Sequence, residues 1–400
     1  MTPDKSYNGY RSFQYLESGK DFEDFRLVKE TNRVPSKEIR LSKEEEEKLN
    51  EIIQNNVIIS THDHTFVMPE DLSQAKNYFR QNKIMTGYYG LSKSGLDAVF
   101  DGLLNSFDNI NSKVPWKWDS IVYEIGMRLS DLSHQNYAIR GERVQDIINA
   151  HKNGNIAIIF HLEGASMIEN DLDRIDILYG FGVRAMGLVY SESNMIGGGL
   201  KEKKDGGLTR FGYEVTERMN KIGMAVDLAH CGDQTSLDAI EASKVPVLIS
   251  HAGSRTVWKT NRMKPDEVIQ ALAEKGGIIG IEAAPHTTIS EKHPRHSLES
   301  VMDHFQYLEG LIGVDHIAFG PDSLFGDHVG MHHAFSKELG ISEAQKMVRY
   351  DEVPYVDGIE NPSEFKNIIR WLIKNGYSEE VIKKVSGGNV LRVLERIWVR

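Results

Sequence analysis

The chain has 400 residues, of which 40% are hydrophobic and 26% charged, so it is long enough for two ordinary domains or for one large α/β barrel. Its 58 acidic residues outnumber its 47 basic ones and give a net charge of -11, which argues against a nucleic-acid surface because phosphate binding needs a concentrated Lys/Arg face. A small molecule or a short peptide is therefore the expected partner. No stretch is apolar for long enough to span a bilayer, so we expect no membrane contact.

Cysteine usage and the N-terminus indicate a cytoplasmic protein. Residues 1–25 are charged from the fourth position and lack the apolar segment of a secretory signal. Cys231 is the single cysteine, which excludes an intrachain disulfide and a thiolate-rich zinc site, and we expect it to be a small packed residue. Any metal ion must therefore be held by His, Asp and Glu, and 15 His are available.

The first predicted element is a helix. Ser42 and Glu45 have the spacing of a capping box, and the run KEEEEKLNEIIQNN continues from it. We expect an N-terminal extension with this lead-in helix over residues 1–50 and a single domain over residues 51–400. Apolar or β-rich runs then predict eight strands, at residues 57–61, 96–103, 156–161, 184–189, 223–228, 246–250, 277–282 and 316–320.

The alternation of strands and helices predicts an α/β fold of the (β/α)8, TIM-barrel type. Most of the strand runs are nearly continuously apolar, as in strands buried on both faces, and segments with helical periodicity such as ERVQDIINAHKN and PDEVIQALAEKG separate them. Eight strands with helical crossovers favour a closed barrel. The alternative is a doubly wound open sheet, but nothing in the chain resembles its Gly-rich dinucleotide fingerprint.

Polar side chains stand at the C-terminal ends of most predicted strands. A lone His after a strand is usually a hydrogen-bonded structural residue, but a set that follows one geometric rule indicates a site. In a barrel these strand ends converge on one rim, where catalytic groups gather. The set consists of His62, His64, Glu163, Tyr190, His230, His251 and Asp322.

The pattern of the first and third strand ends indicates metal ligands. His62 and His64 are two residues apart and share a face of an extended strand, while Asp63 points to the other face. His161 and Glu163 also share a face, and a carboxylate at a buried barrel mouth is costly unless a cation balances it. We therefore take Glu163 as a candidate ligand that bridges two ions, and His161 as a hydrogen-bond partner rather than a ligand.

Two further imidazoles complete the predicted ligand set. His230 and His251 each follow an apolar strand and a small residue, and imidazole with carboxylate suits zinc, with manganese or cobalt as substitutes. Four His and one Glu exceed the needs of one zinc ion, so we expect two ions bridged by Glu163 and a hydroxide that attacks a carbonyl. Asp322 would take the proton of the water and pass it to the leaving amine, although a Gly-Pro-Asp turn also uses Asp as a turn former.

From about residue 50 onward the chain resembles the membrane dipeptidase family, peptidase family M19 of the amidohydrolase superfamily. The resemblance is carried by HLEGA, FGVRAMGLVYSESN, GGLTRFGYEVTERMNKIGMAVDLAHCGDQTSLDAIEASKVPVLISHAGSR and VSGGNVLRVLERIW. It implies a zinc-dependent, homodimeric (β/α)8 dipeptidase that cleaves short substrates with a free carboxylate. It also implies that His62 begins the metal motif, Glu163 bridges the two zinc ions, His230 and His251 hold the second ion, Asp322 is the acid/base, and Arg262 clamps the substrate carboxylate.

Two positions depart from the family pattern. His64 stands where the family has an Asp ligand, so one anionic ligand is replaced by a neutral one. Tyr190 stands where the family has a His that polarises the substrate, and a phenol can still donate a hydrogen bond to an oxyanion. These departures keep two alternatives open: an amidohydrolase acting on a non-peptide amide such as an N-acyl amino acid or a lactam, and a non-catalytic homologue.

Three histidines after the last predicted strand have no counterpart in the family pattern. His328, His332 and His333 lie in SLFGDHVGMHHAF, and we expect them to be exposed loop residues. They could instead line the substrate mouth or add a ligand.

Overall fold

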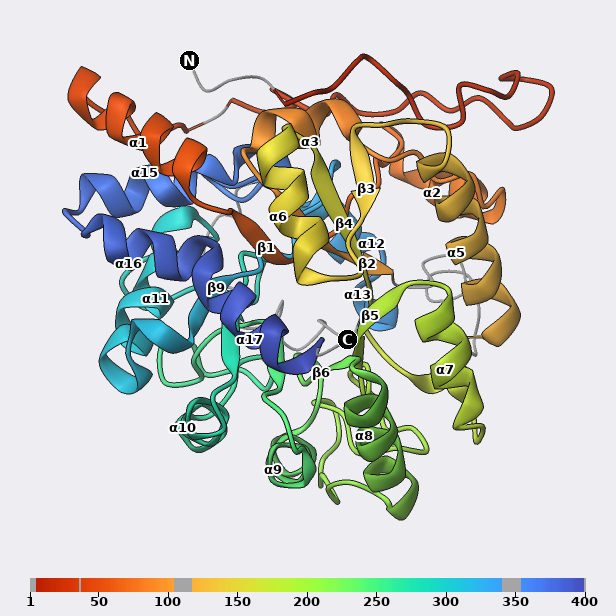
Figure 1. The fold of residues 1–400 in the computed structure, drawn as a ribbon, viewed down its shortest axis with the longest axis vertical. Coiled ribbons are helices and arrows are strands. Elements are labelled where there is room, and N and C mark those ends of the chain that lie inside the picture. Colours follow the sequence, from red (N-terminus) through yellow and green to blue (C-terminus); the bar gives the residue numbers. More distant parts are fainter. Residues whose placement is uncertain (1–4, 36, 104–116, 340–353, 399–400) are drawn as a thin grey trace.

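The core of the molecule is a barrel of parallel strands. The computed structural model describes residues 5–35, 37–103, 117–339 and 354–398. Eight strands pair in parallel in the order β1-β2-β4-β5-β6-β7-β8-β9, which follows the chain without the reversal of a doubly wound sheet and confirms the predicted barrel (Figure 1). Their bounds are β1 (Ile59–Asp63), β2 (Ala98–Leu103), β4 (Ile156–Leu162), β5 (Val183–Gly187), β6 (Ala225–Asp227), β7 (Leu248–Ala252), β8 (Ile278–Ile281) and β9 (Ile317–Phe319).

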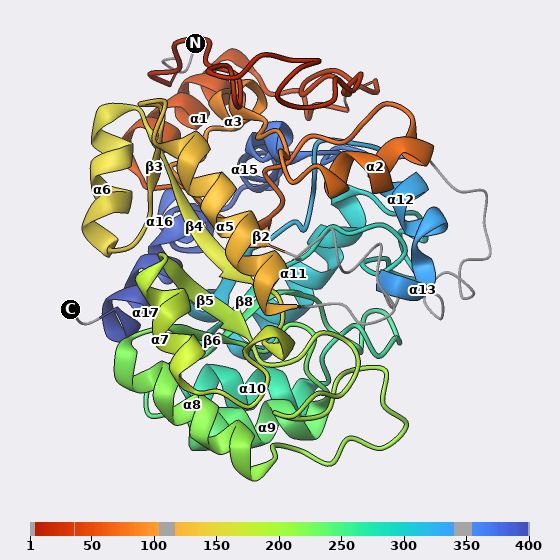
Figure 2. The same ribbon diagram turned by 90° about the vertical axis from the view of Figure 1, so that its right-hand side faces the viewer.

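Helices surround the strands, and Figure 2 shows α6 to α10 following one another around the outside. The predicted lead-in helix is α1, with the capping box of Ser42 and Glu45 in place. The helices are α1 (Lys43–Asn55), α2 (Ala75–Arg80), α3 (Tyr88–Ser94), α5 (Trp118–Leu132), α6 (Val144–Asn153), α7 (Asp173–Gly180), α8 (Arg210–Ile222), α9 (Asp233–Ala242), α10 (Asp266–Glu274), α11 (Leu298–Ile312), α12 (His328–Ala334), α13 (Ser336–Leu339), α15 (Lys366–Lys374), α16 (Glu379–Lys383) and α17 (Asn389–Ile397).

The first and last strands of the barrel meet through hydrogen bonds just beyond their C-terminal ends. The Asp322 N–H donates to the His62 carbonyl at 3.0 Å, and the His64 N–H donates to the Ser323 carbonyl at 2.8 Å. Side chains that follow β9 are thereby held beside those of β1. The closure of the barrel is what brings residues 260 positions apart in the sequence into one site.

Helix α17 closes the opposite end of the barrel. Its buried apolar side chains pack against strand residues of which half are alanine, and the small alanine side chains leave room for the helix. The Asn389 amide at its start donates to the carbonyls of Val314 and Ile317 at 2.7 and 2.8 Å. The cluster includes Ala98, Ala157, Ala185, Ala225 and Ala318 from the strands and Val390, Val393, Leu394 and Ile397 from the helix.

Between this plug and the rim, the barrel interior is narrow. The Thr61 hydroxyl on β1 donates across it to the Ser250 carbonyl on β7 at 2.7 Å. Gly280 and Gly320 flank this bond, and a Cβ atom on Gly280 would lie 2.1 Å from both Ser250 O and Thr61 Oγ1. Glycine is needed here because any side chain would clash. The close packing sets the distance between β1 and β7, and with it the distance between His62 and His251.

The structure differs from the sequence prediction in two details of the sheet. The ladder of β1 starts at Ile59 rather than at residue 57, so His62 and Asp63 belong to the strand instead of following it. A short strand, β3 (Ala138–Arg140), was not predicted and pairs with β4 outside the barrel path. In the described ranges no helix is both long and apolar enough to cross a membrane.

The described part of the N-terminal extension packs onto the barrel domain. It lies along the top edge in Figures 1 and 2. The Tyr10 hydroxyl donates to Asp131 Oδ1 on α5 at 2.7 Å, and the Val28 N–H donates to the Met68 carbonyl at 3.0 Å. The boundary at residue 50 stays a prediction, but the extension contributes contacts that the barrel alone would lack.

Substituting alanine at Gly280 tests the narrow interior. Because the added Cβ would meet a backbone carbonyl, we expect Gly280→Ala to lower the free energy of unfolding by about 3 kcal/mol. Gly310→Ala is the control: it lies in α11 with open space around its Cβ position, and the change should be neutral or stabilise by up to about 1 kcal/mol. Urea denaturation of both variants measures the difference, and equal stabilities would contradict the interpretation.

Candidate metal centre

Six of the predicted site residues gather at the C-terminal rim of the barrel. They come from β1 and the residue after it, from the residue after β4, from the turn after β6, from β7 and from the segment after β9. Five are buried, with exposed fractions of 7% or less, and the sixth, Asp322, has a side chain 16% exposed. The six are His62, His64, Glu163, His230, His251 and Asp322.

Glu163 lies between two pairs of imidazoles. Its Oε1 atom is 3.6 Å from Nε2 of both His62 and His64. Its Oε2 atom is 3.4 Å from His230 Nε2 and 3.7 Å from His251 Nε2. One carboxylate thus faces two separate imidazole pairs with one oxygen each, which is the arrangement of a bridging ligand.

The distances fit metal coordination. Two ligands of one tetrahedral zinc ion, each about 2.1 Å from it, lie about 3.4 Å apart. The Nε2 atoms of His230 and His251 are 3.1 Å apart, and Nε2 of His62 and Oε1 of Glu163 are buried atoms that lack a hydrogen-bond partner. Inward-facing lone pairs at this spacing repel one another unless a cation lies between them, so the residues fit the metal ions that the sequence predicts.

Asp322 adds a carboxylate to the His62 and His64 side of the site. Its Oδ1 atom lies 3.4 Å from His62 Nε2 and 3.2 Å from His64 Nε2. Its backbone has a φ of 55°, in the left-handed region, so the turn needs support. Asp63 provides it, because Asp63 Oδ1 accepts from the N–H and the hydroxyl of Ser323 at 2.9 and 2.7 Å. Asp63 therefore points away from the imidazoles and holds the turn of Asp322 in place.

A glycine makes room for the imidazoles of His62 and His64. A Cβ atom on Gly102 of β2 would lie 2.5 Å from His62 Cε1 and 2.8 Å from His64 Cε1. The Gly102 carbonyl accepts from His64 Nδ1 at 2.8 Å, which places the His64 proton on Nδ1 and leaves the Nε2 lone pair facing the carboxylates.

Asp227, at the end of β6, orients imidazoles on both sides of the site. His161 Nε2 donates to Asp227 Oδ2 at 3.0 Å, and His161 Nδ1 lies 3.1 Å from His62 Nδ1. The Ser250 hydroxyl also donates to Asp227 Oδ2, at 2.7 Å, and is 2.8 Å from His251 Nδ1. In both series of hydrogen bonds the proton of the imidazole next to the centre, His62 or His251, is assigned to Nδ1. The Nε2 atom of that imidazole then has a lone pair that can bind a metal ion. His161 thus has the hydrogen-bonding place that we expected.

The electrostatics of the site call for positive charge. Burial raises the pKa of Glu163 to about 8, so a lone carboxylate here resists ionisation. Burial lowers the pKa of His64, but its hydrogen bond to Asp322 and the charge of Glu163 outweigh this and raise it to about 9. Without a metal ion a proton supplies part of the charge that the carboxylates need. A divalent cation would supply it more fully.

Tyr190 lies against the His230 ring, with the two ring centroids 4.1 Å apart and the planes at 24°. Burial raises its pKa well above 10, and the charges of Glu163 and Asp322 raise it further. The phenol is therefore protonated at neutral pH. It can donate a hydrogen bond at the edge of the centre.

Arg262, the predicted clamp for a substrate carboxylate, lies directly behind His230 and His251, two of the predicted ligands. Its Nη2 donates to the His251 carbonyl at 3.0 Å and its Nη1 donates to the Ala229 carbonyl at 3.2 Å. Nη2 also forms an ion pair with Glu282 Oε2. The predicted clamp thus already has a carboxylate partner within the chain.

The prediction that the histidines after the last strand are exposed loop residues is wrong in part. All three lie on helix α12 rather than in a loop; His328 and His332 are 6% and 5% exposed, and only His333 is exposed as predicted. Spaced four residues apart, His328 and His332 share a helix face, with ring centroids 4.4 Å apart. His332 Nδ1 lies 3.1 Å from the Pro285 carbonyl and 3.4 Å from His286 Nδ1, so α12 packs on the segment after β8.

Two site residues were missed by the sequence analysis. Glu282 directly follows β8, where the rule of polar residues at strand ends would have found it, but it was counted as part of the strand. Asp227 lies inside the apolar run of β6, and only its carboxylate sets it apart. A buried Asp or Glu within a predicted strand was the available signal for both.

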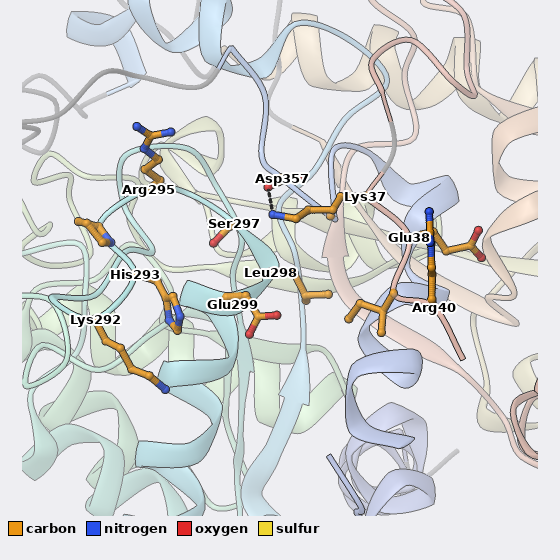
Figure 3. Close-up of a pocket in the computed structure, with 13 residues that line it drawn as sticks. Lys37, Glu38, Arg40, Lys292, His293, Arg295, Ser297, Leu298, Glu299 and Asp357 are labelled. Atoms are coloured by element: carbon orange, nitrogen blue, oxygen red, sulfur yellow. Dashed lines mark hydrogen bonds and ion pairs between the residues drawn. The ribbon is translucent and has the colours of Figure 1, made fainter. Parts of the chain in front are cut away.

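A separate pocket of about 680 Å³ lies between the N-terminal segment and the start of α11 (Figure 3). None of the predicted site residues lines it. Basic and acidic side chains both line this pocket, and Lys37 forms an ion pair with Asp357 at 2.6 Å across it. Its charged lining includes Lys37, Glu38, Arg40, Lys292, Arg295, Glu299 and Asp357.

The chain is similar in sequence to proteins that are named dipeptidases. It is 27% identical over 258 residues to Dipeptidase tcpJ of Claviceps purpurea, covering 64% of this chain and 54% of that one. It is 24% identical over 339 residues to Dipeptidase 3 of Homo sapiens, covering 82% of this chain and 63% of that one. The chain therefore spans between about half and two thirds of the length of these relatives.

A solved structure agrees with the fold, and a family profile gives the family. The structure of an amidohydrolase from Pseudomonas aeruginosa superposes with a TM-score of 0.72 at 23% identity, covering 88% of this chain and 99% of that one, and so shares the fold. The sequence profile of the membrane dipeptidase family matches residues 122–339 and 347–398, which include most of the centre described above. The chain belongs to the membrane dipeptidase family, peptidase family M19.

Proposed function

We propose that the protein is a metal-dependent dipeptidase, which hydrolyses the amide bond of dipeptide-sized substrates. The observation that carries the proposal is the position of Glu163, whose two carboxylate oxygens each face a separate imidazole pair with Asp322 alongside. Family membership and the dipeptidase names of the relatives support it.

The ions that we propose are two zinc ions. Imidazole nitrogen and carboxylate oxygen are ligands that zinc accepts readily, and cysteine takes no part in the set. When bound, such ions supply a nucleophilic water at neutral pH and polarise the scissile carbonyl. His62, His64 and one oxygen of Glu163 would hold one ion, and His230, His251 and the other oxygen would hold the second. A homodimer and a cytoplasmic location, both expected from the sequence, stay predictions.

Asp322 is the group that we propose to move the proton. Its side chain is the most exposed of the carboxylates at the centre, so a substrate can reach it. As a base it accepts a proton from the attacking water, and as an acid it passes that proton to the amine that leaves when the amide bond breaks. Asp63 keeps this carboxylate in position through Ser323.

Tyr190 is placed to stabilise negative charge on the substrate. Its ring stacks on His230, and its protonated hydroxyl can donate to the oxygen of a tetrahedral intermediate. A non-catalytic role for the barrel is disfavoured, because a binding protein has no need of a buried carboxylate, four imidazoles and a supported acid/base at one rim.

Metal removal tests the proposed function. Purified protein should contain about two metal ions per chain and hydrolyse members of a dipeptide panel, and a chelator should abolish turnover until zinc is restored. Elemental analysis and an assay for released amino acid measure both quantities. Metal-free protein with undiminished turnover, or metal-loaded protein with none on any dipeptide, would contradict the proposal.

Asp322→Asn tests the proton-transfer role. The amide cannot accept and return a proton, so kcat should fall by about 100-fold or more while the bound metal stays. Asp315→Asn is the control, since Asp315 precedes the same strand at the opposite end of the barrel and its side chain forms a surface ion pair with Lys384. Steady-state kinetics with metal analysis distinguishes the two, and full activity of Asp322→Asn would rule the role out.

Asp227→Asn tests the support of the imidazoles. Losing the acceptor for both His161 and Ser250 releases the proton positions at His62 and His251, so zinc affinity should fall by roughly 10- to 100-fold. Competition with a chromophoric chelator measures it. The matched control is Asp173→Asn, which removes only a surface ion pair with Arg218 and should bind zinc as the wild type does.

A further inference from the structure

The segment from Asp322 to Phe325 is held at both of its ends. At its start the Asp322 N–H donates to the His62 carbonyl at 3.0 Å, and at its end the Phe325 carbonyl accepts from the Met68 N–H at 2.8 Å. Asp322 has a φ of 55°, in the left-handed region, so its turn keeps this conformation only while its surroundings hold it. The place of Phe325 therefore bears directly on the place of the Asp322 carboxylate.

The ring of Phe325 lies against the backbone at the start of α3. Its side chain is buried, with an exposed fraction of 1%. A Cβ atom would lie 2.5 Å from the ring at Gly87 and 2.3 Å from it at Gly90. Only glycine at these two positions lets the ring pack so closely, and the ring can stay there only while α3 does.

The N-terminal extension holds the start of α3 in place. Figures 1 and 2 both show the extension passing beside this helix. Glu30 Oε2 accepts from the Gly90 N–H at 2.7 Å. The Ser12 hydroxyl accepts from the N–H of Thr86 at 2.8 Å, immediately before the helix. Both bonds fix the backbone against which Phe325 packs.

A second contact between the extension and Phe325 runs through the segment after β1. The Val28 N–H donates to the Met68 carbonyl at 3.0 Å, while the Met68 N–H donates to the Phe325 carbonyl. Leu27, next to Val28, pairs in antiparallel fashion with Pro69. One residue, Met68, thus separates the extension from the segment that carries Asp322.

We propose that the N-terminal extension positions Asp322, with Phe325 as the positioning residue that connects the two. The inference rests on the proposed function, because it concerns the group that moves the proton. A displacement of about 1 Å at a reacting group can lower a rate by about 100-fold, so a loosened Asp322 segment lowers kcat. The proposed metal ligands are placed by the ends of other barrel strands as well as β1, so the metal content stays the same.

Glu30→Ala in full-length, zinc-loaded protein tests the catalytic consequence. We expect kcat per metal-loaded chain to fall by about fivefold or more, with KM changed by less than about twofold. Glu17→Ala is the matched control, since Glu17 lies in the same extension and its side chain forms an exposed ion pair with Lys20 at 2.8 Å. It should keep the wild-type kcat, and a wild-type kcat in Glu30→Ala would overturn the inference.

Hydrogen exchange of the amides from Asp322 to Phe325 tests the positioning without any turnover. These amides should exchange about tenfold faster or more in Glu30→Ala, and also in Gly90→Ala, where the added Cβ would meet the Phe325 ring. Gly126→Ala in α5 has open space at its Cβ position and should exchange as the wild type does. Unchanged exchange in both test variants would overturn the inference.

The two measurements separate the inference from the proposed function. Wild-type protein that hydrolyses no dipeptide would overturn the proposed function and the catalytic role of the extension with it. Faster exchange in Glu30→Ala would in that case still support the physical link between the extension and Asp322. Active wild-type protein with unchanged exchange and kcat in the variants would overturn the inference alone.

Discussion

The site depends on one carboxylate that is almost completely removed from water. Glu163 cannot stay ionised at the mouth of a barrel unless positive charge faces it, and each of its oxygens faces a different imidazole pair. The same burial that makes the carboxylate costly makes the Coulomb attraction of a cation strong, because little water is there to screen it. The imidazoles, the Asp322 carboxylate and the closure of the barrel are arranged around this carboxylate.

The barrel meets the constraint through its closure. Asp322 must stand within 3.4 Å of His62, although 260 residues separate the two positions, and it does so in a strained backbone conformation. The bonds between the ends of β1 and β9, strengthened by the Asp63 carboxylate on Ser323, hold that conformation. Asp63 lies between the two predicted ligands His62 and His64, but its side chain is on the other face of the strand, where it accepts hydrogen bonds from Ser323.

The eight barrel strands and the ligand-type residues followed from the sequence because both are local signals. Apolar runs mark buried parallel strands, and polar residues at their ends mark the rim. The contacts between these side chains could not be predicted from the sequence. Asp227 accepts hydrogen bonds from His161 on a preceding strand and from Ser250 on the following one, and Arg262 lies beside Glu282, 20 positions away. Both sets of contacts depend on how the closed barrel brings strand ends together. The helix α12 was missed because its short run HVGMHHA reads as a polar loop until the packing of His332 on Pro285 is known.

Neutral and anionic side chains together set the charge of the centre. If His64 is a ligand, as the sequence predicts, four neutral imidazoles face the carboxylate of Glu163, so bound metal ions would keep more net positive charge than with a further anionic ligand. Arg262 adds a buried guanidinium behind His230 and His251, and the carboxylate of Glu282 lies beside it. Because little water reaches these groups, their charges act on the centre with little screening, so Arg262 and Glu282 belong to the electrostatics of the site as much as the imidazoles do.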